Sequence, residues 1–153
     1  MSRVVRSAGL LPYRIMSQIE VMLAHPGGPF FTGKDRGAWS IVKGLVEQGE
    51  SDRAAAAREF HEETGWPVGL DDWIPLGEIR LRSRKTVVAW AVNQDFDPLN
   101  LVPGKFTMYG RQYPEIDKVE WMRPGRARTK LNPAQVVFVD RLVARLELNG
   151  GQR

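Results

Sequence analysis

The stretch that decides the fold runs from residue 44 to residue 66 and reads GLVEQGESDRAAAAREFHEETGW. Within it, Glu59, Glu62 and Glu63 stand at positions i, i+3 and i+4. At about 100° per residue, this spacing places the three carboxylates on one face of a helix. Like charges at these spacings destabilise an isolated helix, so the pattern indicates a bound cation. A chain without cysteine that offers carboxylate oxygens suits Mg²⁺, Mn²⁺ or Ca²⁺.

The sequence also marks both ends of this helix. Ser51 is a favourable N-cap, and the four alanines at 54–57 are strong helix formers. Gly65 suits the left-handed conformation of a C-cap, and Pro67 prevents the helix from continuing. We therefore expect a helix between the caps at Ser51 and Gly65.

Side-chain size separates the faces of this expected helix. Ala55 and Ala56 share the glutamate face, where their small side chains would leave room for an ion and a substrate. Phe60 points away from that face, and we expect it in the core.

The same stretch resembles the Nudix box. Apolar residues stand at Phe60 and Trp66 as that box requires. Its seven fixed positions are all matched, by Gly44, Glu50, Arg58, Glu59, Glu62, Glu63 and Gly65. This resemblance implies an α/β fold, a Nudix-type α/β/α sandwich with a mixed β-sheet. It also implies metal-dependent hydrolysis of a nucleoside diphosphate linked to another moiety, in which water attacks one phosphorus.

Carried over by position, the resemblance assigns roles to the residues of the box. The metal ligands would be Glu59, Glu62 and Glu63 with the carbonyl of Gly44, and the ion would be Mg²⁺ or Mn²⁺. Glu59 is alternatively the general base. Arg58 would orient carboxylates through a fork-like salt bridge with Glu50 or Glu59.

Residues outside the box complete the candidate site. Lys43 belongs to the pattern Trp-x-x-x-Lys-Gly, which resembles a Nudix subgroup that includes dinucleoside polyphosphate hydrolases, although many members carry Pro at the position of Val42. Some Nudix proteins place a further metal-binding acid before the last strand. Glu115 is the candidate here, with Asp117 in reserve, and Glu47 could join the metal shell.

Composition sets the broader class. The 153 residues are most simply one domain, 1–153, with ordinary hydrophobic and charged content. The absence of cysteine excludes disulfides and thiol nucleophiles, and no apolar run approaches a membrane span. The N-terminal residues lack the apolar core of a signal peptide, so we expect a cytoplasmic protein. The net charge of +4 suits an anionic substrate, although surplus basic residues also serve solubility.

Hydrophobic patterns predict strands and helices that alternate along the chain. We expect strands at 3–14, 19–24, 39–43, 73–83, 86–94 and 119–122, and a final helix over 133–148 capped by Asn132. The strand at 87–92 is apolar on both faces, which indicates a central position. The final helix would bury a stripe of aliphatic residues, namely Val136, Val137, Val139, Leu142, Val143 and Leu146.

Two long connections, 25–37 and 95–118, are candidates for substrate contacts. In the first, Lys34 and Arg36 would bind phosphate, although a solvated loop explains them equally well. In the second, Tyr109 or Tyr113 would stack on a nucleobase, unless these rings pack the loop onto the core.

Two further features have ordinary structural explanations. His25 stands at a strand end, where a histidine is more often structural than catalytic. Arg80, Arg82 and Arg84 alternate and would share one strand face, where they either bind substrate phosphates or protect a sheet edge.

These observations favour a Nudix pyrophosphohydrolase that acts on a nucleoside triphosphate or a dinucleoside polyphosphate. Its partner would be a small nucleotide, with no membrane and no obligate nucleic acid, and a homodimer is possible because similar proteins often form one. The alternative is a non-catalytic nucleotide or RNA sensor on the same fold, which the retention of every box glutamate disfavours. The isomerase use of this fold would need a thiol that the chain lacks.

Overall fold

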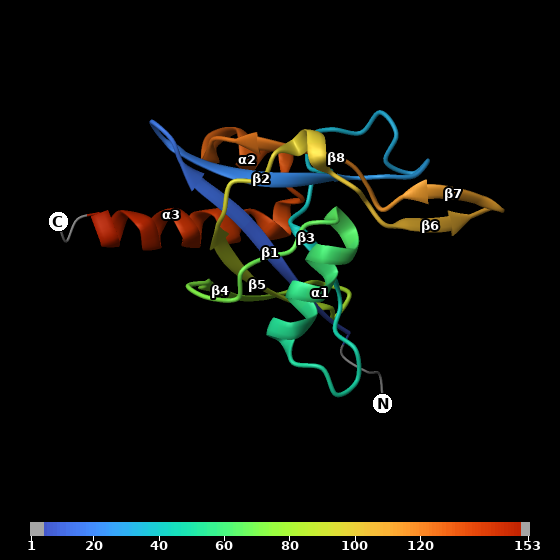
Figure 1. Ribbon diagram of the computed structural model, residues 1–153, viewed down its shortest axis with the longest axis horizontal. Helices are drawn as coiled ribbons and strands as arrows, with labels where there is room; N and C mark the ends of the chain where they lie inside the picture. The colour runs from blue at the N-terminus through green and yellow to red at the C-terminus, as the bar shows by residue number, and fades with distance from the viewer. Residues whose placement is uncertain (1–4, 151–153) are drawn as a thin grey trace.

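The computed structural model describes residues 5–150 and shows a mixed β-sheet between two helical layers (Figure 1). The strands and helices follow one another as β1 Arg6–Ile15, β2 Ile19–Pro26, β3 Val42–Leu45, α1 Asp52–Thr64, β4 Ile74–Arg80, β5 Thr86–Asn93, β6 Lys105–Met108, β7 Arg111–Pro114, β8 Ile116–Met122, α2 Pro124–Lys130 and α3 Val136–Gly150. Short 3₁₀ turns occur at Pro98–Asn100 and Pro133–Gln135. The α/β/α sandwich expected from the sequence is confirmed.

The main sheet has the strand order β4-β5-β1-β2-β8. β1 and β5 are parallel, whereas the other neighbours are antiparallel, so the sheet is mixed as predicted. β3 pairs with the first half of β1 through Ser7 to Leu10, and β2 pairs with the last residues of β1. β2 and β3 therefore lie along different parts of β1, and the candidate site lies near the place where these two strands separate.

Each face of the sheet has its own hydrophobic core. On one face, Ala55, Ala56 and Phe60 of α1 are fully buried against Leu10 and Met22 of the sheet. On the other face, the buried residues of the two later helices cover the sheet, namely Ala127, Phe138, Val139 and Leu142. β5 lies between β4 and β1, so the predicted central position of this strand is correct.

The expected caps fix the ends of α1. Ser51 accepts a hydrogen bond from the backbone N–H of Ala54, and Gly65 adopts a left-handed φ of 79° while its N–H bonds to the carbonyl of His61. One expectation about this helix is wrong, because Ala55 and Ala56 lie in the core instead of beside the glutamates. Their small side chains allow α1 to approach the sheet closely.

Loss of the N-cap should weaken the fold measurably. We expect Ser51→Ala to lower the free energy of unfolding by about 1 kcal/mol, because the N–H of Ala54 loses its acceptor. Chemical denaturation at neutral pH measures this difference. Ser51→Thr keeps the acceptor and is the matched control, so equal losses in the two variants would contradict the capping role.

Several strand boundaries differ from the predictions. The strand expected at 3–14 is β1, which begins at Arg6 and ends at Ile15. Residues 3 and 4 lie outside the described part of the chain. The strand expected at 39–43 is shifted to β3, while Trp39 and Ser40 form only isolated bridges. β2 and β8 are each longer than expected.

The predicted arginine row is wrong. β4 ends at Arg80, whereas Arg82 lies in the turn that follows and Arg84 adopts a left-handed φ of 66°. The chain has to reverse here to enter β5, so the three side chains do not share one strand face.

The connection expected over 95–118 is not irregular. It contains the 3₁₀ turn Pro98–Asn100 and a separate two-stranded hairpin made of β6 and β7. In Figure 1 this hairpin stands clear of the body of the protein on the right. The alternation of apolar and polar residues over only four positions per strand was too short to reveal it.

The C-terminal part also departs from expectation. The basic stretch after β8 forms α2, which begins with Pro124 at its first turn. Asn132 caps the 3₁₀ turn Pro133–Gln135, and α3 begins only at Val136. Phe138, absent from the predicted stripe, is fully buried. Among the described residues, no helix has the length and apolar run that crossing a membrane requires.

Candidate functional site

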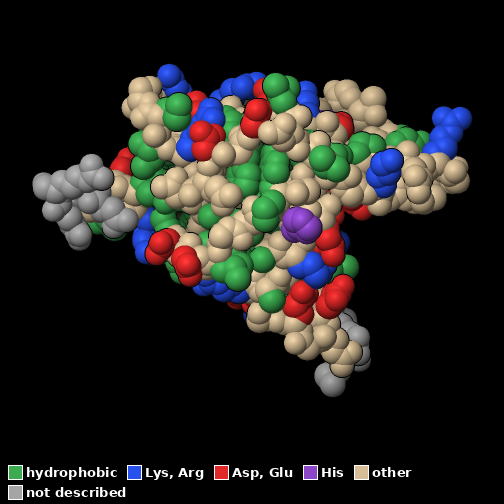
Figure 2. Space-filling view, in the orientation of Figure 1, with side chains coloured by type: hydrophobic (Ala, Val, Ile, Leu, Met, Phe, Trp, Pro, Cys, Tyr) green, Lys and Arg blue, Asp and Glu red, His purple; other side chains and the backbone are tan. Residues whose placement is uncertain are grey.

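A cleft of about 690 Å³ lies between α1 and the strands β2 and β3. Its lining comes from β2, from β3 and the residues before it, from α1 and from the start of β8. The charged and ligand-type residues in its walls are Lys43, Gly44, Glu47, Arg58, Glu59, Glu62, Glu63 and Glu115. Acidic side chains gather beside α1 in the space-filling view (Figure 2). The cleft therefore brings together most of the site residues that the sequence singled out.

Gly44 makes room for the first glutamate of the group. A Cβ atom at this position would lie 2.0 Å from the carboxyl carbon of Glu59 and 2.1 Å from one of its oxygens. The carboxylate thus occupies the space that any side chain at residue 44 would fill. This contact explains, in atomic terms, why a glycine must stand fifteen residues before that glutamate.

Arg58 organises the carboxylates around it. Its Nε and Nη2 donate to the two oxygens of Glu50 at 2.8 and 3.0 Å, which is the fork-like pair that the sequence suggested. Its Nη1 donates to Glu59 at 2.9 Å and to Glu62 at 3.1 Å, and Nη2 also donates to the carbonyl of Leu45 at 2.9 Å. All five guanidinium N–H groups are used, so the side chain is fixed in one position.

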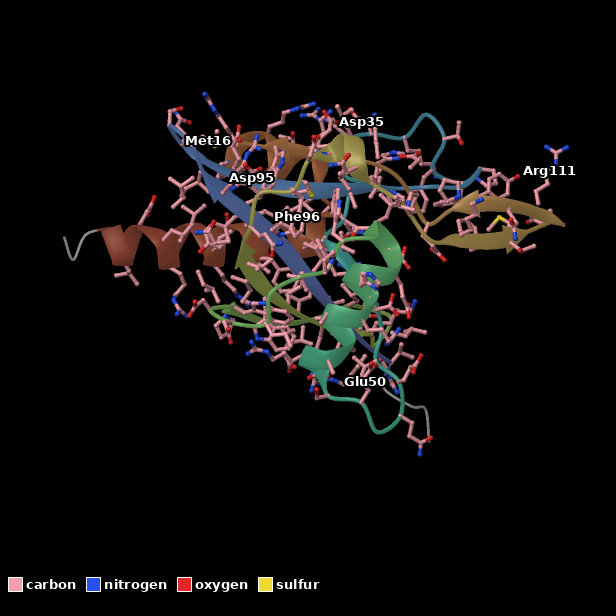
Figure 3. All side chains as sticks on the ribbon, in the orientation of Figure 1. Met16, Asp35, Glu50, Asp95, Phe96 and Arg111 are labelled. Atoms are coloured by element: carbon pink, nitrogen blue, oxygen red, sulfur yellow. The ribbon has the colours of Figure 1, made fainter. Side chains whose placement is uncertain are left out.

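Glu50 lies at the N-terminal side of α1, where Figure 3 labels it. Its hydrogen bonds from Arg58, and then from the backbone N–H of Glu47, lower the pKa of Glu50 from an ordinary 4.5 to about 2. A lowered pKa means that the ionised carboxylate stabilises the folded state. That contribution is complete above a pH of about 4.5 and disappears as the pH falls toward about 2.

Comparing Glu50→Gln with the wild type should expose this contribution. We expect the variant to be less stable at neutral pH, and the difference to shrink between a pH of about 4.5 and about 2, where Glu50 becomes protonated. Denaturation curves at several pH values measure it. Glu47→Gln is the control, since Glu47 is 3.9 Å from Arg58 and 70% exposed; a constant difference at every pH would contradict the prediction.

The remaining acids of the cleft are crowded. Burial raises the pKa of Glu63 to about 7, and repulsion from Glu115, Glu59 and Glu62 adds to the shift. Burial also raises the pKa of Glu59, although Arg58 opposes it, and burial raises the pKa of Glu115. A low-dielectric site that holds several carboxylates favours either a proton or a cation among them.

Lys43 precedes Gly44 on β3 and is the one lysine among the residues that line the cleft. Burial lowers the pKa of its ammonium group, and the neighbouring charge of Lys85 lowers it further, whereas Glu59 opposes both effects. Nothing in the sequence indicated that Lys85 approaches the cleft. The pairing of β3 with β1, and of β1 with β5, produces this proximity.

The donors in the cleft suit a hard divalent cation. They are carboxylate oxygens and a backbone carbonyl, which are the ligands that Mg²⁺ and Mn²⁺ prefer. Within residues 5–150, no three acidic or histidine side chains are already arranged around one point, because Arg58 holds Glu59 and Glu62. The backbone of Gly44 closely approaches the carboxylate of Glu59, and the residues fit a cation that would draw the carboxylates together.

Three predicted substrate contacts lie outside the cleft walls. Arg36 is exposed on the loop before β3, and Tyr109 is 92% exposed at the end of the β6–β7 hairpin. Tyr113 packs against Phe106 within that hairpin, with 5.9 Å between the ring centroids. None of the three is positioned to contact a diphosphate held by the cleft residues.

The reserve acid has a structural partner instead. Asp117 accepts from Nδ1 of His25 at 2.9 Å, and Nε2 of the same ring lies 2.7 Å from the carbonyl oxygen of Lys34. His25 is almost fully buried and ties the following loop to β8. These contacts are consistent with a structural role for His25.

A family model described as the NUDIX domain matches residues 6–142. The 8-oxo-(d)GTP phosphatase of Mycolicibacterium smegmatis is 33% identical over 128 residues, which cover 75% of this chain and 40% of that protein. The RNA pyrophosphohydrolase of Roseobacter denitrificans is 42% identical over 76 residues, which cover 42% of this chain and 46% of that protein. The chain thus spans less than half the length of these curated relatives.

Solved structures share the architecture over nearly the whole chain. A binary complex of the Ap4A hydrolase of C. elegans has a TM-score of 0.66 at 23% identity, covering 94% of this chain and 98% of that one. The NUDIX domain of Shewanella oneidensis NrtR, complexed with ADP ribose, has a TM-score of 0.66 at 13% identity, covering 95% and 90%. At these identities the likeness concerns the fold.

Proposed function

Because the chain belongs to the Nudix family, we propose that it hydrolyses a pyrophosphate bond within a nucleotide, with a divalent cation held in the cleft beside α1. The observation that carries this proposal is the convergence of Glu59, Glu62, Glu63 and Glu115 on one cleft. Several acids that line one space suit a cation and, through that cation, a phosphate chain.

Different residues of the cleft would have different roles in the proposed reaction. A bound divalent cation would polarise the phosphate oxygens and neutralise the charge that develops on them. Glu62, Glu63 and Glu115, with the Gly44 carbonyl, would hold that cation. Arg58 would position Glu59 and Glu62, because its remaining donors fix it to Glu50 and Leu45. Lys43, beside Gly44 on β3, would contact phosphate oxygens of the substrate.

Glu59 has two possible tasks, and its surroundings suit both. Its carboxylate lies against Gly44 and accepts from Arg58, so it is held rigidly enough to be a ligand. A rigid carboxylate of raised pKa is also a suitable general base for the attacking water. The reaction adds water across a P–O–P linkage, so one phosphorus gains the hydroxyl group and the leaving phosphate oxygen gains a proton.

The relatives support a nucleotide as the substrate. Their names describe a phosphatase for 8-oxo-(d)GTP and a pyrophosphohydrolase for RNA, and both kinds of molecule carry pyrophosphate bonds next to a nucleoside. A nucleoside triphosphate, a dinucleoside polyphosphate and a 5′-triphosphorylated RNA are therefore the proposed substrates. The basic net charge favours such polyanions.

A side-by-side panel of substrates tests the proposal. Phosphate and pyrophosphate release would be measured for nucleoside triphosphates, dinucleoside polyphosphates, nucleotide sugars and 5′-triphosphorylated RNA, each with Mg²⁺, with Mn²⁺ and with a chelator. We expect turnover of at least one substrate that depends on the metal. Folded protein that turns over none of them would contradict the proposal, and tight nucleotide binding without turnover would favour the non-catalytic sensor.

A further inference from the structure

The β6–β7 hairpin forms an arm (residues 105–114) that the proposed reaction in the cleft does not use. Its two strands make a sheet of their own, separate from the main sheet. Figure 1 shows the arm projecting from the body, and Figure 3 labels Arg111 at its far end, where the side chain points away from the protein. A two-stranded hairpin gains little stability by itself, so a projecting arm suggests a contact with another molecule.

The base of the arm is attached to the wall of the cleft. The N–H of Glu115 donates to the carbonyl of Gly104 at 2.8 Å, and the N–H of Gly27 donates to the carbonyl of Glu115 at 3.0 Å. The ring of Phe106 packs against Gly28, where a Cβ atom would lie 2.6 Å from it. The arm therefore starts at a cleft acid, Glu115, and leads outward from it.

The tip of the arm carries an unfavourable residue for its conformation. Met108 pairs with Arg111, so Tyr109 and Gly110 form a two-residue turn, with φ values of 51° and 75°. Two positive φ values define a type I′ turn, in which Asn-Gly is preferred because asparagine tolerates the left-handed region. Tyr109 is strained there and buries almost nothing, since it is 92% exposed. Folding therefore does not explain a tyrosine at this position.

The chemistry of the arm suits a single-stranded nucleic acid. Residues 104–114 contain no acid, and within the described part of the chain neither Lys105 nor Arg111 forms an ion pair, although both are exposed. An exposed aromatic ring between basic side chains is the combination that binds phosphates and stacks on bases without sequence preference. An acidic protein partner would be attracted by the charges but would not need the strained aromatic ring.

The position of the arm identifies which part of such a strand it would meet. At about 3.3 Å per residue, four residues per strand carry the tip about 13 Å beyond Glu115. A nucleotide chain that continues from phosphates held in the cleft can extend along that distance, whereas a single nucleotide has no further base to offer. We propose that the β6–β7 arm binds the single-stranded RNA that follows a 5′-terminal phosphate chain held in the cleft. RNA chains retain such a 5′-triphosphate because their synthesis begins with a nucleoside triphosphate.

This inference rests on the proposed function, and its first test compares two substrates. Wild type and Tyr109→Ala would be given a nucleoside triphosphate, and an RNA of about eight nucleotides that begins with the same triphosphate and carries a 3′ fluorophore. We expect the ratio of kcat/KM for the RNA to kcat/KM for the mononucleotide to fall about tenfold, the cost of losing one stacked base. Tyr109→Phe keeps the ring and should keep the ratio.

A second substitution distinguishes recognition from structure. Tyr109→Asn places the preferred residue in the type I′ turn, so we expect the protein to be at least as stable as the wild type in a denaturation curve. The same variant lacks the ring and should lose the RNA preference as Tyr109→Ala does. If the tyrosine served the fold alone, Tyr109→Asn would be less stable than the wild type and would keep the preference for RNA.

Salt dependence tests the basic side chains of the arm. For the double variant Lys105→Ala and Arg111→Ala, the slope of log affinity for the RNA against log salt should become shallower by about 0.7 for each lost phosphate contact. Arg145→Ala on α3 removes an exposed charge on a distant element and is the control; its slope should equal that of the wild type.

The outcomes separate this inference from the proposed function. If the wild type hydrolyses no member of the substrate panel, the proposed function fails, but fluorescence anisotropy of the same RNA still tests the arm through the weaker binding expected of Tyr109→Ala. Equal RNA affinity and an equal substrate ratio in wild type and Tyr109→Ala would overturn the inference. So would an arm variant that changes the sedimenting mass of the protein while RNA binding is unchanged, since the arm would then bind a second copy of the chain.

Discussion

Glu63→Gln is expected to lower turnover by at least about two orders of magnitude while the protein stays folded. Glu63 lies in the crowded part of the cleft, where burial and three neighbouring acids raise its pKa to about 7. The amide fills the same space but cannot neutralise a divalent cation, so the proposed site loses charge that the phosphate chain depends on. The measurement is steady-state hydrolysis of whichever substrate the panel identifies, at saturating metal.

Stability should not fall with activity in this variant. The raised pKa means that the ionised carboxylate of Glu63 is less favourable in the folded protein than in the unfolded chain. We therefore expect the metal-free Glu63→Gln protein to unfold at the same or a higher temperature than the wild type at neutral pH. Glu147→Gln, an exposed acid on α3, is the matched control and should retain activity. Near-normal turnover in Glu63→Gln would show that this carboxylate is not part of the reaction.

Gly44→Ala is expected to reduce activity on the order of a hundredfold with only a small loss of stability. The new methyl group would lie 2.0 Å from the carboxyl carbon of Glu59, far inside van der Waals contact. The carboxylate is the end of a flexible side chain, so it can move aside without unfolding the sheet. A displacement of about 1 Å at a catalytic group can cost about a hundredfold in rate.

The control for this variant is another glycine whose added Cβ meets nothing. Gly125→Ala introduces the same methyl group with no heavy atom within 4 Å, so turnover should be unchanged. Comparing kcat and metal affinity in Gly44→Ala also separates the two tasks considered for Glu59. Weaker metal binding would indicate a ligand, whereas a lower kcat at saturating metal would indicate the general base. If Gly44→Ala had the kcat and the metal affinity of the wild type, the close contact between residue 44 and Glu59 would not be required.

Local features of the sequence predicted the helix of the site well. Ser51 and Gly65 act within one turn of the residues they cap, so their effect does not depend on the rest of the chain. The contact of Arg58 with Glu59, its neighbour in the sequence, is local in the same way. Interactions of this range can be predicted without knowledge of the fold.

The errors share a different cause. Ala55 and Ala56 were placed beside the ion because their spacing allows it, but the approach of β1 decides that they are buried. The strand expected at 73–83 runs too far, because the pairing of Arg80 with Thr86, which sets where the chain reverses, cannot be placed from a short apolar pattern. Helix α2 was missed because its seven residues carry little helical signal of their own, and its one buried residue, Ala127, packs in a core formed by distant parts of the chain.

The sequence by itself determined that a capped helix presents three glutamates and an arginine on neighbouring positions, because helical geometry follows from residue spacing alone. Only the tertiary structure decided which of those acids is buried and that the carboxylate of Glu59 occupies the space of a side chain at Gly44. It also decided that Glu115, just before β8, lines the cleft while Tyr109 does not. These facts depend on contacts between residues far apart in the chain, and on the solvent those contacts exclude, neither of which is encoded in any short stretch of sequence.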